Sequence, residues 1–299
     1  GSSLDGLDMA LCRFELAPQD AVPLMDWELL AARTAPFSDA WRERLRRLPQ
    51  AGGLDLAVAH VDFGHYLASL LQPFLDELSL RPDCIASHGH TIFHYPGRRL
   101  TLQIGDGAAI AAACGQVVVD NFRAMDLALG GQGAPLAPLA DTLLLPGYDF
   151  YLNLGGIANI SARAGDRQVA FDISGANQVL DALARQLGRD YDEDGRLAAS
   201  GRLVPELLAT ADDLPYYEQP YPKSLGNDWV QEELIPRFLH FEAPVVDKLH
   251  TACLQLARQT ARALQLILES KGPQSDSCRM LVTGGGAFNT FLVDCIRRE

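Results

Sequence analysis

The stretch Phe150-Tyr-Leu-Asn-Leu-Gly-Gly-Ile-Ala-Asn159 contributes most to the prediction of the fold. Its first half, Phe150–Leu154, is a short apolar run typical of a buried β-strand. Gly155 and Gly156 follow at once, and glycine lets a backbone turn tightly and approach a ligand closely. A strand followed by such a turn can point N–H groups at an anion, although a lone Gly-Gly pair most often marks only a tight turn. The stretch alone leaves both roles open.

Two further glycine-rich turns lie next to predicted strands. Residues 1–8 run into the apolar strand predicted over 9–14, and residues 284–289 follow the strand Met280–Thr283. Neither turn has the spacing of a P-loop or of a dinucleotide-binding fingerprint. The three turns are more than a hundred residues apart along the chain. One nucleotide held between two lobes explains them better than three unrelated turns.

Short apolar runs alternate with segments of helical periodicity along the chain. Helices are predicted over 54–78, 177–187 and 245–268, and further strands over 83–87, 100–104, 117–119 and 169–173. This mixture is typical of an α/β protein. The turn-forming stretch Leu145-Pro-Gly-Tyr148 predicts a boundary between an N-terminal lobe, residues 1–147, and a C-terminal lobe, residues 148–299.

Length and composition exclude several classes of protein. The 299 residues suffice for about two domains, and 48% of them are hydrophobic, which is ample for packed cores. No apolar run approaches the ~20 residues of a membrane span. The net charge of −13 argues against a nucleic-acid-binding surface but not against ATP, which backbone N–H groups can hold. Six scattered cysteines without a Cys-x-x-Cys pair favour a reduced, cytoplasmic location.

Two groups of carboxylates are candidates for chemistry. Asp5 and Asp8 flank Gly6 in the first turn. They either form the turn or place a carboxylate beside a magnesium ion and its water. Asp126 lies among apolar residues and is followed by Gly130-Gly-Gln-Gly133, which places it near a special turn. A single Asp on a short helix is otherwise most often a solvated surface residue.

The segment Ser87-His-Gly-His-Thr91 suggests either a metal site or contacts to a polar substrate. His88 and His90 would share one face of a strand, as metal ligands do in some hydrolases. No Asp or Glu follows nearby to complete a site, and Gly89 indicates a loop. Substrate contacts are therefore the favoured interpretation, with a structural role as the remaining alternative.

Three other polar side chains have an open role. His60 and His65 lie five positions apart on the predicted helix 54–78 and do not share a face, so we interpret them as structural or exposed. Lys223, in the loop Tyr221-Pro-Lys-Ser-Leu-Gly226, either reaches a phosphate or is solvated. The sequence favours neither alternative.

Together these segments resemble the anhydro-N-acetylmuramic acid kinases along nearly the whole chain. Seven segments carry the resemblance in order: residues 1–8, Ser-His-Gly-His 87–90, Thr-Leu-Gln-Ile-Gly-Asp 101–106, Phe-Arg-Ala-Met-Asp 122–126 with Gly-Gly-Gln-Gly-Ala-Pro-Leu 130–136, Leu-Asn-Leu-Gly-Gly-Ile-Ala-Asn 152–159, Pro-Lys-Ser-Leu-Gly 222–226 and Thr-Gly-Gly-Gly-Ala-Phe-Asn 283–289. The stretches 130–136 and 152–159 are long and specific.

The resemblance implies a two-lobed, actin-like ATPase fold of the hexokinase type, related to ribonuclease H, with ATP and Mg²⁺ in the cleft between the lobes. The implied ATP contacts come from the three turns: Gly1, Ser2, Ser3, Leu4, Asp5, Gly6, Leu7 and Asp8; Asn153, Gly155, Gly156 and Asn159; and Gly284, Gly285, Gly286 and Asn289. Asp5 would hold the metal through water. A homodimer is also implied.

The resemblance further implies the reaction, which belongs to peptidoglycan recycling. Family members open the 1,6-anhydro ring of anhydro-N-acetylmuramic acid with water and phosphorylate the freed O6 from ATP. Asp126 matches their general base, and the candidate sugar contacts are His88, His90, Gln103, Arg123 and Gln132. One carboxylate suffices because the γ-phosphoryl group captures the leaving oxygen, whereas ordinary glycosidases need a separate acid. The alternatives are a kinase of another sugar or acid on this fold, and a non-catalytic sugar or nucleotide sensor, which Asp126 disfavours.

The chain departs from the family pattern at several positions. Ser2 stands where Thr is usual, and His90 where Gln is common. Asn121 replaces an Asp before Phe-Arg, with Asp120 one position early. The stretch 172–177 keeps its terminal Asp and Asn but lacks Thr-Gly-Pro-Gly between them, which puts that contact in doubt.

Both ends look incomplete beside the family pattern. Its residues before the first turn and its tail beyond Glu299 have no counterpart, and the chain stops within a helix predicted after Asn289. We therefore expect the chain as printed to be less stable or less active than one with both segments.

Overall fold

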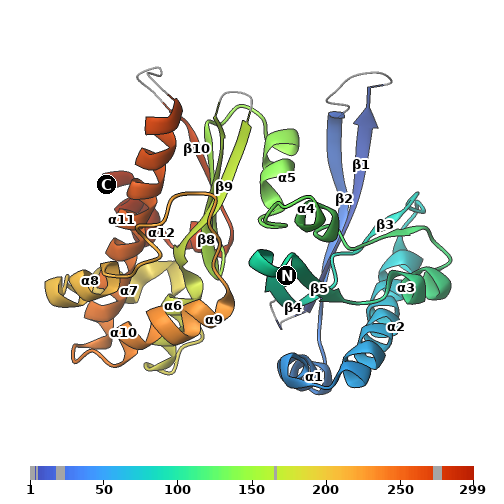
Figure 1. The fold of residues 1–299 in the computed structure, drawn as a ribbon, viewed down its shortest axis with the longest axis horizontal. Helices are drawn as coiled ribbons and strands as arrows, with labels where there is room; N and C mark the ends of the chain where they lie inside the picture. Colours follow the sequence, from blue (N-terminus) through green and yellow to red (C-terminus); the bar gives the residue numbers. More distant parts are fainter. Residues whose placement is uncertain (1–3, 5, 18–23, 165–166, 272–277) are drawn as a thin grey trace. The chain divides into compact units, whose positions relative to one another are not determined.

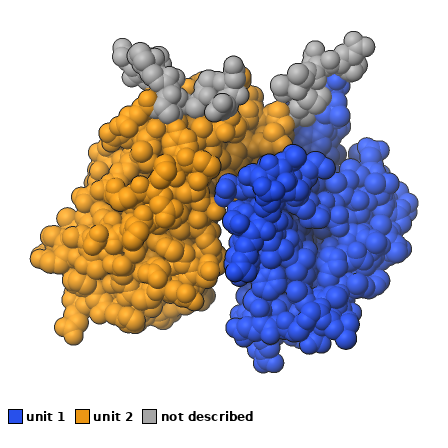
Figure 2. All heavy atoms as spheres, in the orientation of Figure 1, with its two compact units in different colours: residues 1–133 blue, residues 134–299 orange. Residues whose placement is uncertain are grey.

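The computed structural model describes residue 4 and residues 6–17, 24–164, 167–271 and 278–299. The chain divides into two compact units, Gly1–Gly133 and Ala134–Glu299, which Figure 2 colours blue and orange. Each unit has its own hydrophobic core and contains both strands and helices (Figure 1). The predicted α/β class is confirmed, and the lobe boundary predicted at residues 147 and 148 stays a prediction.

Unit 1 combines small sheets with two packed helices. Its elements in order are β1 (Gly6–Leu16), β2 (Leu24–Pro36), α1 (Asp39–Arg47), a 3₁₀ turn (Leu48–Gln50), α2 (Gly53–Glu77), β3 (Ile85–Ala86), β4 (His90–Tyr95), a second 3₁₀ turn (Pro96–Arg98), β5 (Leu100–Ile104), α3 (Gly107–Cys114), β6 (Val118–Val119) and α4 (Ala124–Ala128). Strands β1 and β2 pair antiparallel, as do β4 and β5, whereas β3 and β6 pair parallel.

The core of unit 1 forms where α2 packs against α3 and β5. Phe63, Leu67 and Ile104 are almost fully buried there. Gly64 allows this close packing, because an added Cβ would lie 2.6 Å from the Asp106 carbonyl oxygen. Asp106 is the N-cap of α3, where its carboxylate accepts a hydrogen bond from the Ala109 N–H at 3.0 Å. The helix pair therefore fixes the segment that joins β5 to α3.

An aromatic cluster lies at one end of this core. The Trp41 ring stacks on Tyr66 with centroids 5.2 Å apart and contacts Phe63 at 5.0 Å. Phe63 in turn meets the imidazole of His90 edge-on, with centroids 6.3 Å apart. The cluster thus joins α1 and α2 to the start of β4.

Unit 2 is built on a four-stranded sheet with helices packed around it. Its elements in order are α5 (Ala137–Leu144), β7 (Phe150–Leu154), β8 (Ile157–Ala164), β9 (Arg167–Gly175), α6 (Asn177–Arg185), a 3₁₀ turn (Glu193–Gly195), α7 (Arg196–Ser200), α8 (Pro205–Asp212), α9 (Asn227–Trp229), a π-helical turn (Val230–Leu234), α10 (Ile235–Leu239), α11 (Val245–Lys271), β10 (Met280–Thr283), a 3₁₀ turn (Gly285–Phe288) and α12 (Thr290–Arg298).

The sheet of unit 2 has the strand order β10-β7-β8-β9. Strands β7, β8 and β9 form an antiparallel meander, and β10 runs parallel to β7. Helix α11 buries the stripe predicted from its sequence, which includes Leu249, Cys253 and Leu256. Because β7 and β10 are parallel neighbours, their C-terminal ends lie at the same edge of the sheet.

Most predicted elements are confirmed, and three strands were missed. The strands at 100–104, 150–154 and 280–283 match those predicted, and the three predicted helices are present. The sequence analysis missed β2, β4 and β8. The start of β8 was interpreted as part of the glycine turn, because polar residues interrupt its apolar ones. β4 was missed because Gly89 indicated a loop. No helix in the described part of the chain is long and apolar enough to cross a membrane.

Candidate functional site

A polar cavity of about 200 Å³ lies within unit 1. Strands β3 and β6 are parallel, so the residues that follow them emerge at the same edge, and these residues supply one part of the lining. Helix α2 and strand β5 supply another part. The polar side chains of the lining are those of His60, Ser87, His88, Thr101, Gln103, Asp120 and Asn121. A small, mostly polar ligand suits a cavity of this kind better than an apolar one.

A chain of hydrogen bonds connects this cavity to Asp126. The Nε–H of Arg123 donates to Nε2 of His88 at 3.0 Å, and its Nη1 donates to the Gly133 carbonyl oxygen at 2.6 Å. The Gly133 N–H donates to Oδ2 of Asp126 at 2.6 Å. Arg123 directly precedes α4 and Asp126 lies within it, so one short segment presents both side chains. The carboxylate of Asp126 therefore has a fixed relation to the cavity lining.

The protonation state of His88 suits this arrangement. Burial, reinforced by the charge of Arg123, lowers the pKa of His88 to about 4. The imidazole is therefore neutral near pH 7. Its Nδ1–H donates to the Gly89 carbonyl oxygen at 3.0 Å, which leaves Nε2 as the acceptor for Arg123. A neutral His88 is thus needed for the hydrogen bond from the guanidinium.

The glycine turn after α4 wraps around the Asp126 carboxylate. A Cβ added at Gly131 would overlap the carboxylate atoms of Asp126. Gly133 has a φ of +64°, which side-chain-bearing residues adopt rarely. The Gly131 N–H also donates to the Asp126 carbonyl oxygen at 2.8 Å. Small residues are therefore required here so that the turn can hold the carboxylate.

The five candidate sugar contacts all lie in unit 1, in different settings. His88 and Gln103 line the cavity, and Arg123 contacts His88. Gln132 lies in the glycine turn beside Asp126. His90 is 7% exposed and packs against Phe63, and burial lowers its pKa to about 4.

The alternative metal site at the two histidines gains no support. His90 begins β4, whereas His88 precedes the strand, so they do not share a strand face as expected. Among the described residues there is no group of three or more His, Cys, Asp or Glu side chains that could hold a metal ion. The favoured interpretation of this segment therefore remains contacts to a polar substrate.

The second and third glycine turns are neighbours in unit 2. Thr283 of β10 pairs with Asn153 of β7, and the two turns follow these residues at the same edge of the sheet. A Cβ added at Gly284 would lie 2.7 Å from the Leu154 carbonyl oxygen, and one at Gly286 would lie 2.7 Å from Cβ of Leu154. The two turns thus pack directly on each other.

The exposure of these glycines leaves backbone open to a ligand. Gly156, Gly284 and Gly285 are exposed, whereas Gly155 is half-buried and Gly286 is buried. Of the first turn, Leu4, Gly6, Leu7 and Asp8 are described, whereas Gly1, Ser2, Ser3 and Asp5 lie outside the described residues. The metal role predicted for Asp5 also falls outside them.

Polar residues cross the sheet of unit 2 beside these turns. Asn153 pairs with Asn159, and Asn159 pairs with Asp172, so the three strands of the meander each contribute one polar side chain. The Asp172 carboxylate accepts a hydrogen bond from the Leu225 N–H at 2.9 Å. Asn289 has a structural task, because its Oδ1 accepts the Leu292 N–H at 2.9 Å and caps α12.

Comparison with known proteins identifies the family. A family model described as anhydro-N-acetylmuramic acid kinase matches residues 1–299. The chain belongs to the anhydro-N-acetylmuramic acid kinase family. The anhydro-N-acetylmuramic acid kinase of Pseudomonas fluorescens is 34% identical over 98% of this chain and 80% of its own length. That of Streptomyces coelicolor is 36% identical over 100% of this chain and 78% of its own length.

Two solved structures share a weaker likeness with this member of the anhydro-N-acetylmuramic acid kinase family. Component A of the (R)-2-hydroxyglutaryl-CoA dehydratase of Acidaminococcus fermentans is 11% identical with a TM-score of 0.42, over 91% of this chain and 80% of that one. The hexokinase of Schistosoma mansoni complexed with glucose is 11% identical with a TM-score of 0.37, over 99% of this chain and 80% of that one. These TM-scores are too low to support an argument.

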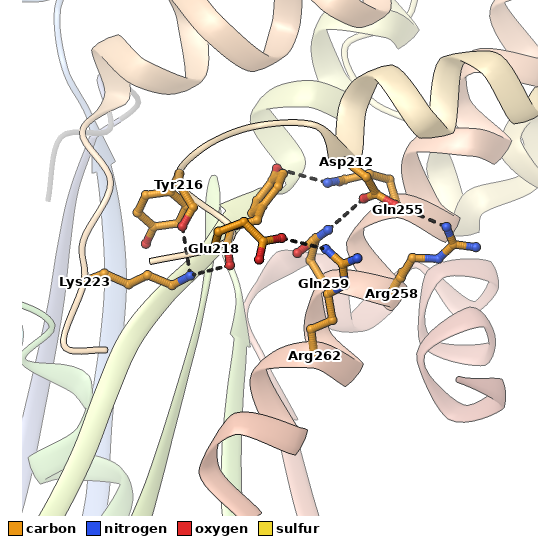
Figure 3. Close-up of polar contacts among 9 residues, drawn as sticks. Asp212, Tyr216, Glu218, Lys223, Gln255, Arg258, Gln259 and Arg262 are labelled. Carbon is orange, nitrogen blue, oxygen red and sulfur yellow. Dashed lines mark hydrogen bonds and ion pairs between the residues drawn. The ribbon is translucent and has the colours of Figure 1, made fainter. Parts of the chain in front are cut away.

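Lys223, in one of the segments that resemble the anhydro-N-acetylmuramic acid kinases, has a structural task that neither sequence-based alternative describes. Its Nζ donates to the carbonyl oxygens of Tyr216 and Tyr217 at 3.0 and 3.3 Å and lies 4.6 Å from the Tyr216 ring centroid (Figure 3). Burial lowers the pKa of Lys223. Nearby, Gln259 of α11 donates to Asp212 at 2.7 Å. These contacts secure the loop between α8 and α9.

The sequence analysis missed His60, Asp120 and Asn121 as part of the cavity lining. His60 is one turn from Gly64 on the face of α2 that packs against α3. A polar residue within an apolar helix stripe was the signal that could have identified it. Asp120 and Asn121 follow the short strand β6, and only its parallel pairing with β3 brings them to Ser87 and His88.

Proposed function

We propose that this protein opens the 1,6-anhydro ring of anhydro-N-acetylmuramic acid with water and phosphorylates the released O6 from ATP, giving N-acetylmuramic acid 6-phosphate. Family membership over all 299 residues supports an ATP-dependent sugar kinase. The observation that supports a role for particular residues is the position of the Asp126 carboxylate. It accepts a hydrogen bond from the Gly133 N–H and is connected through Gly133 and Arg123 to His88 of the cavity.

In the proposed reaction Asp126 is the general base. It takes a proton from water while the water oxygen attacks C1 of the sugar, and the C1–O6 bond breaks. O6 takes the γ-phosphoryl group of ATP, and ADP leaves. The proton held by Asp126 then returns to solvent. Because the phosphoryl group neutralises the leaving oxygen, no second carboxylate is needed as an acid, in contrast to ordinary glycoside hydrolysis.

The surroundings of Asp126 fit this role because they fix the carboxylate without removing it from solvent. Asp126 is exposed and therefore accessible to a water molecule and a ligand. The contacts from the glycine turn restrict its rotamer before substrate binds. A base that is already oriented contributes more than a mobile one, since orientation is a large part of catalytic power.

The ATP site is proposed at the two neighbouring glycine turns of unit 2, with the first turn of unit 1 as a further contact. The fit rests on the exposed backbone of Gly156, Gly284 and Gly285, which a nucleotide can approach closely. Mg²⁺ is usually held by one or two carboxylates together with nucleotide phosphates, where it stabilises charge on the transferred group. Asp5, through water, is the proposed carboxylate.

Four broader features complete the proposal. The protein has the two-lobed fold of the actin-like ATPases, with a lobe boundary near residues 147 and 148. The protein acts in the cytoplasm, where ATP is available; its six cysteines are all free thiols, which fits a reducing compartment. It forms a homodimer, which size-exclusion chromatography with light scattering tests.

The decisive experiment measures ADP release and the sugar product together. Purified protein is expected to release ADP only when anhydro-N-acetylmuramic acid is present, and mass spectrometry should detect the ring-opened 6-phosphate. Asp126→Asn should abolish both. Asp39→Asn is the matched control, because Asp39 is a fully exposed carboxylate of the same unit. Unchanged turnover in the Asp126 variant would reject the assigned base, and turnover of a different sugar alone would reject the assigned substrate.

A further inference from the structure

The most exposed aromatic side chain in the described part of the chain lies in the third glycine turn. Phe288 is 82% exposed and ends the 3₁₀ turn Gly285–Phe288. Exposure alone does not indicate a site, because single apolar side chains are common on protein surfaces. The position of this ring, beside two turns with exposed glycine backbone, is what requires an explanation.

The backbone that carries Phe288 is held on both sides. The Ala287 N–H donates to the Gly284 carbonyl oxygen, and the Asn289 N–H donates to the Gly286 carbonyl oxygen, both at 3.0 Å. Asn289 in turn caps α12 with its side chain. The turn therefore presents the ring from a fixed backbone position.

The same turn is fastened to the second glycine turn. A Cβ added at Gly286 would lie 2.7 Å from Cβ of Leu154 and 3.1 Å from Oδ1 of Asn177. Asn177 begins α6, and its Nδ2 donates to the Leu154 carbonyl oxygen at 3.1 Å. One side chain thus contacts both turns, and the backbone of Phe288 keeps a fixed relation to the exposed backbone at Gly156.

The chemistry of this edge of the sheet separates the parts of a nucleotide. Exposed glycine backbone at Gly156 and Gly285 suits phosphate, which needs hydrogen-bond donors at close range. A phenyl ring carries neither a donor nor a positive charge, so it does not suit phosphate. Its flat apolar face suits a nucleobase, because bases stack on aromatic rings. Three residues of a 3₁₀ turn advance about 6 Å, so Phe288 is offset from Gly285 by a distance that a ribose can span.

We propose that the ring of Phe288 stacks on the adenine base of ATP, while the glycine backbone beside it contacts the phosphates. The assignment rests on the proposed ATP site and adds the side chain that contacts the base. A ring that contacts a second copy of the chain is the competing explanation, and the experiment below distinguishes the two.

Three substitutions at this position separate stacking from a structural role. Phe288→Ala removes the ring, Phe288→Leu keeps apolar volume without a flat face, and Phe288→Trp supplies a larger flat face. The exposed side chain and the absence of a positive φ at Phe288 allow all three without strain in the turn. Leu187→Ala is the control, because Leu187 is a 44% exposed apolar residue beyond the far end of α6.

Calorimetry measures the binding of ADP and of pyrophosphate, with magnesium present, to each purified variant. Phe288→Ala should weaken ADP binding by about 5- to 100-fold, because the stacking on the base is lost. Phe288→Leu should lie between Phe288→Ala and wild type, and Phe288→Trp should bind ADP at least as tightly as wild type. Pyrophosphate has no base, so its affinity should be the same in all variants. Leu187→Ala should bind both ligands as wild type does.

Fluorescence gives a second readout of the same contact. Phe288→Trp places an indole at the proposed base site, so its emission, compared with that of wild type, should change when ADP is added. Pyrophosphate should leave this emission unchanged. A response of equal size to both ligands would contradict a direct contact with the base.

Three binding results would overturn the assignment. The first is unchanged ADP affinity in Phe288→Ala. The second is equal weakening of ADP and pyrophosphate, which would indicate a displaced turn. The third is a change from dimer to monomer in Phe288→Ala with ADP affinity retained, measured by light scattering, which would place the ring between two copies of the chain.

The same measurements distinguish failure of this assignment from failure of the proposed function. Wild type that binds neither ADP nor pyrophosphate would overturn the proposed use of ATP together with the assignment. ADP binding that depends on Phe288 in a protein without sugar turnover would reject the proposed reaction and support the assignment.

Discussion

Replacing Gly131 by alanine tests whether the glycine turn holds the Asp126 carboxylate, the proposed general base, in place. The added Cβ overlaps the Asp126 carboxylate, so the side chain must move to another rotamer. That movement breaks the hydrogen bond from the Gly133 N–H, which measures 2.6 Å. Gly131 itself has no left-handed backbone conformation, so alanine is tolerated by the main chain.

The size of the effect follows from the bond that is lost. A hydrogen bond to a charged group contributes about 1.5–3 kcal/mol, and each 1.4 kcal/mol corresponds to a tenfold change in rate. We therefore expect kcat to fall by about 10- to 100-fold. The KM for the sugar should change little, because the cavity lining is not touched. The melting temperature should also change little, because Asp126 is exposed.

The assay is steady-state ADP release at saturating ATP across a series of sugar concentrations. Gly97→Ala is the matched control, since Gly97 lies in the same unit and a Cβ there meets nothing within 4 Å. Wild-type kcat in Gly131→Ala would refute the argument that this turn orients the base. A large fall in melting temperature with kcat preserved per folded molecule would refute it as well.

Three other predictions concern stability. Folding lowers the pKa of His88 from 6.5 to about 4, so the melting temperature of wild type should fall as the pH falls from about 6.5 towards 4. The melting temperature of His88→Gln should fall less over that range, and an equal fall in both proteins would contradict the lowered pKa. Lys223→Met removes two hydrogen bonds, one of them to the Tyr216 carbonyl, and should lower the free energy of unfolding by about 1–3 kcal/mol in urea titrations, without raising the sugar KM. Asn289→Ala removes the cap of α12 and should lower the free energy of unfolding by about 1 kcal/mol, whereas Asn289→Asp should lower it much less. Equal decreases in the two variants would argue against the cap.

The sequence was sufficient to predict the elements with strong periodicity. The buried stripe of α11 and the strand Phe150–Leu154 follow from local patterns, because their apolar residues repeat at helical spacing or form one short run. β8 escaped because Asn159 and Ser161 interrupt its apolar residues, and its strand character comes from pairing on both sides. Pairing between distant segments leaves no trace in a local pattern.

The candidate site was predictable where a residue lies in a distinctive motif. Asp126 and Gln103 were found because glycine-rich or family-specific stretches surround them. His60 was missed because its role depends on the close contact between α2 and the segment from Gly105 to Asp106, which a single helix pattern does not reveal. The parallel pairing that brings Asp120 to His88 is likewise a property of the folded unit.

The aromatic cluster of unit 1 gives the protein an intrinsic optical reporter. Trp41 contacts Phe63, which also contacts His90 beside the cavity-lining His88, whereas Trp229 lies in unit 2 with its ring centroid 5.3 Å from that of Tyr216. The emission of the two indoles therefore monitors different halves of the molecule. With Trp229 and Trp27 replaced by phenylalanine, a sugar titration followed by fluorescence would observe the first half alone, without any attached dye.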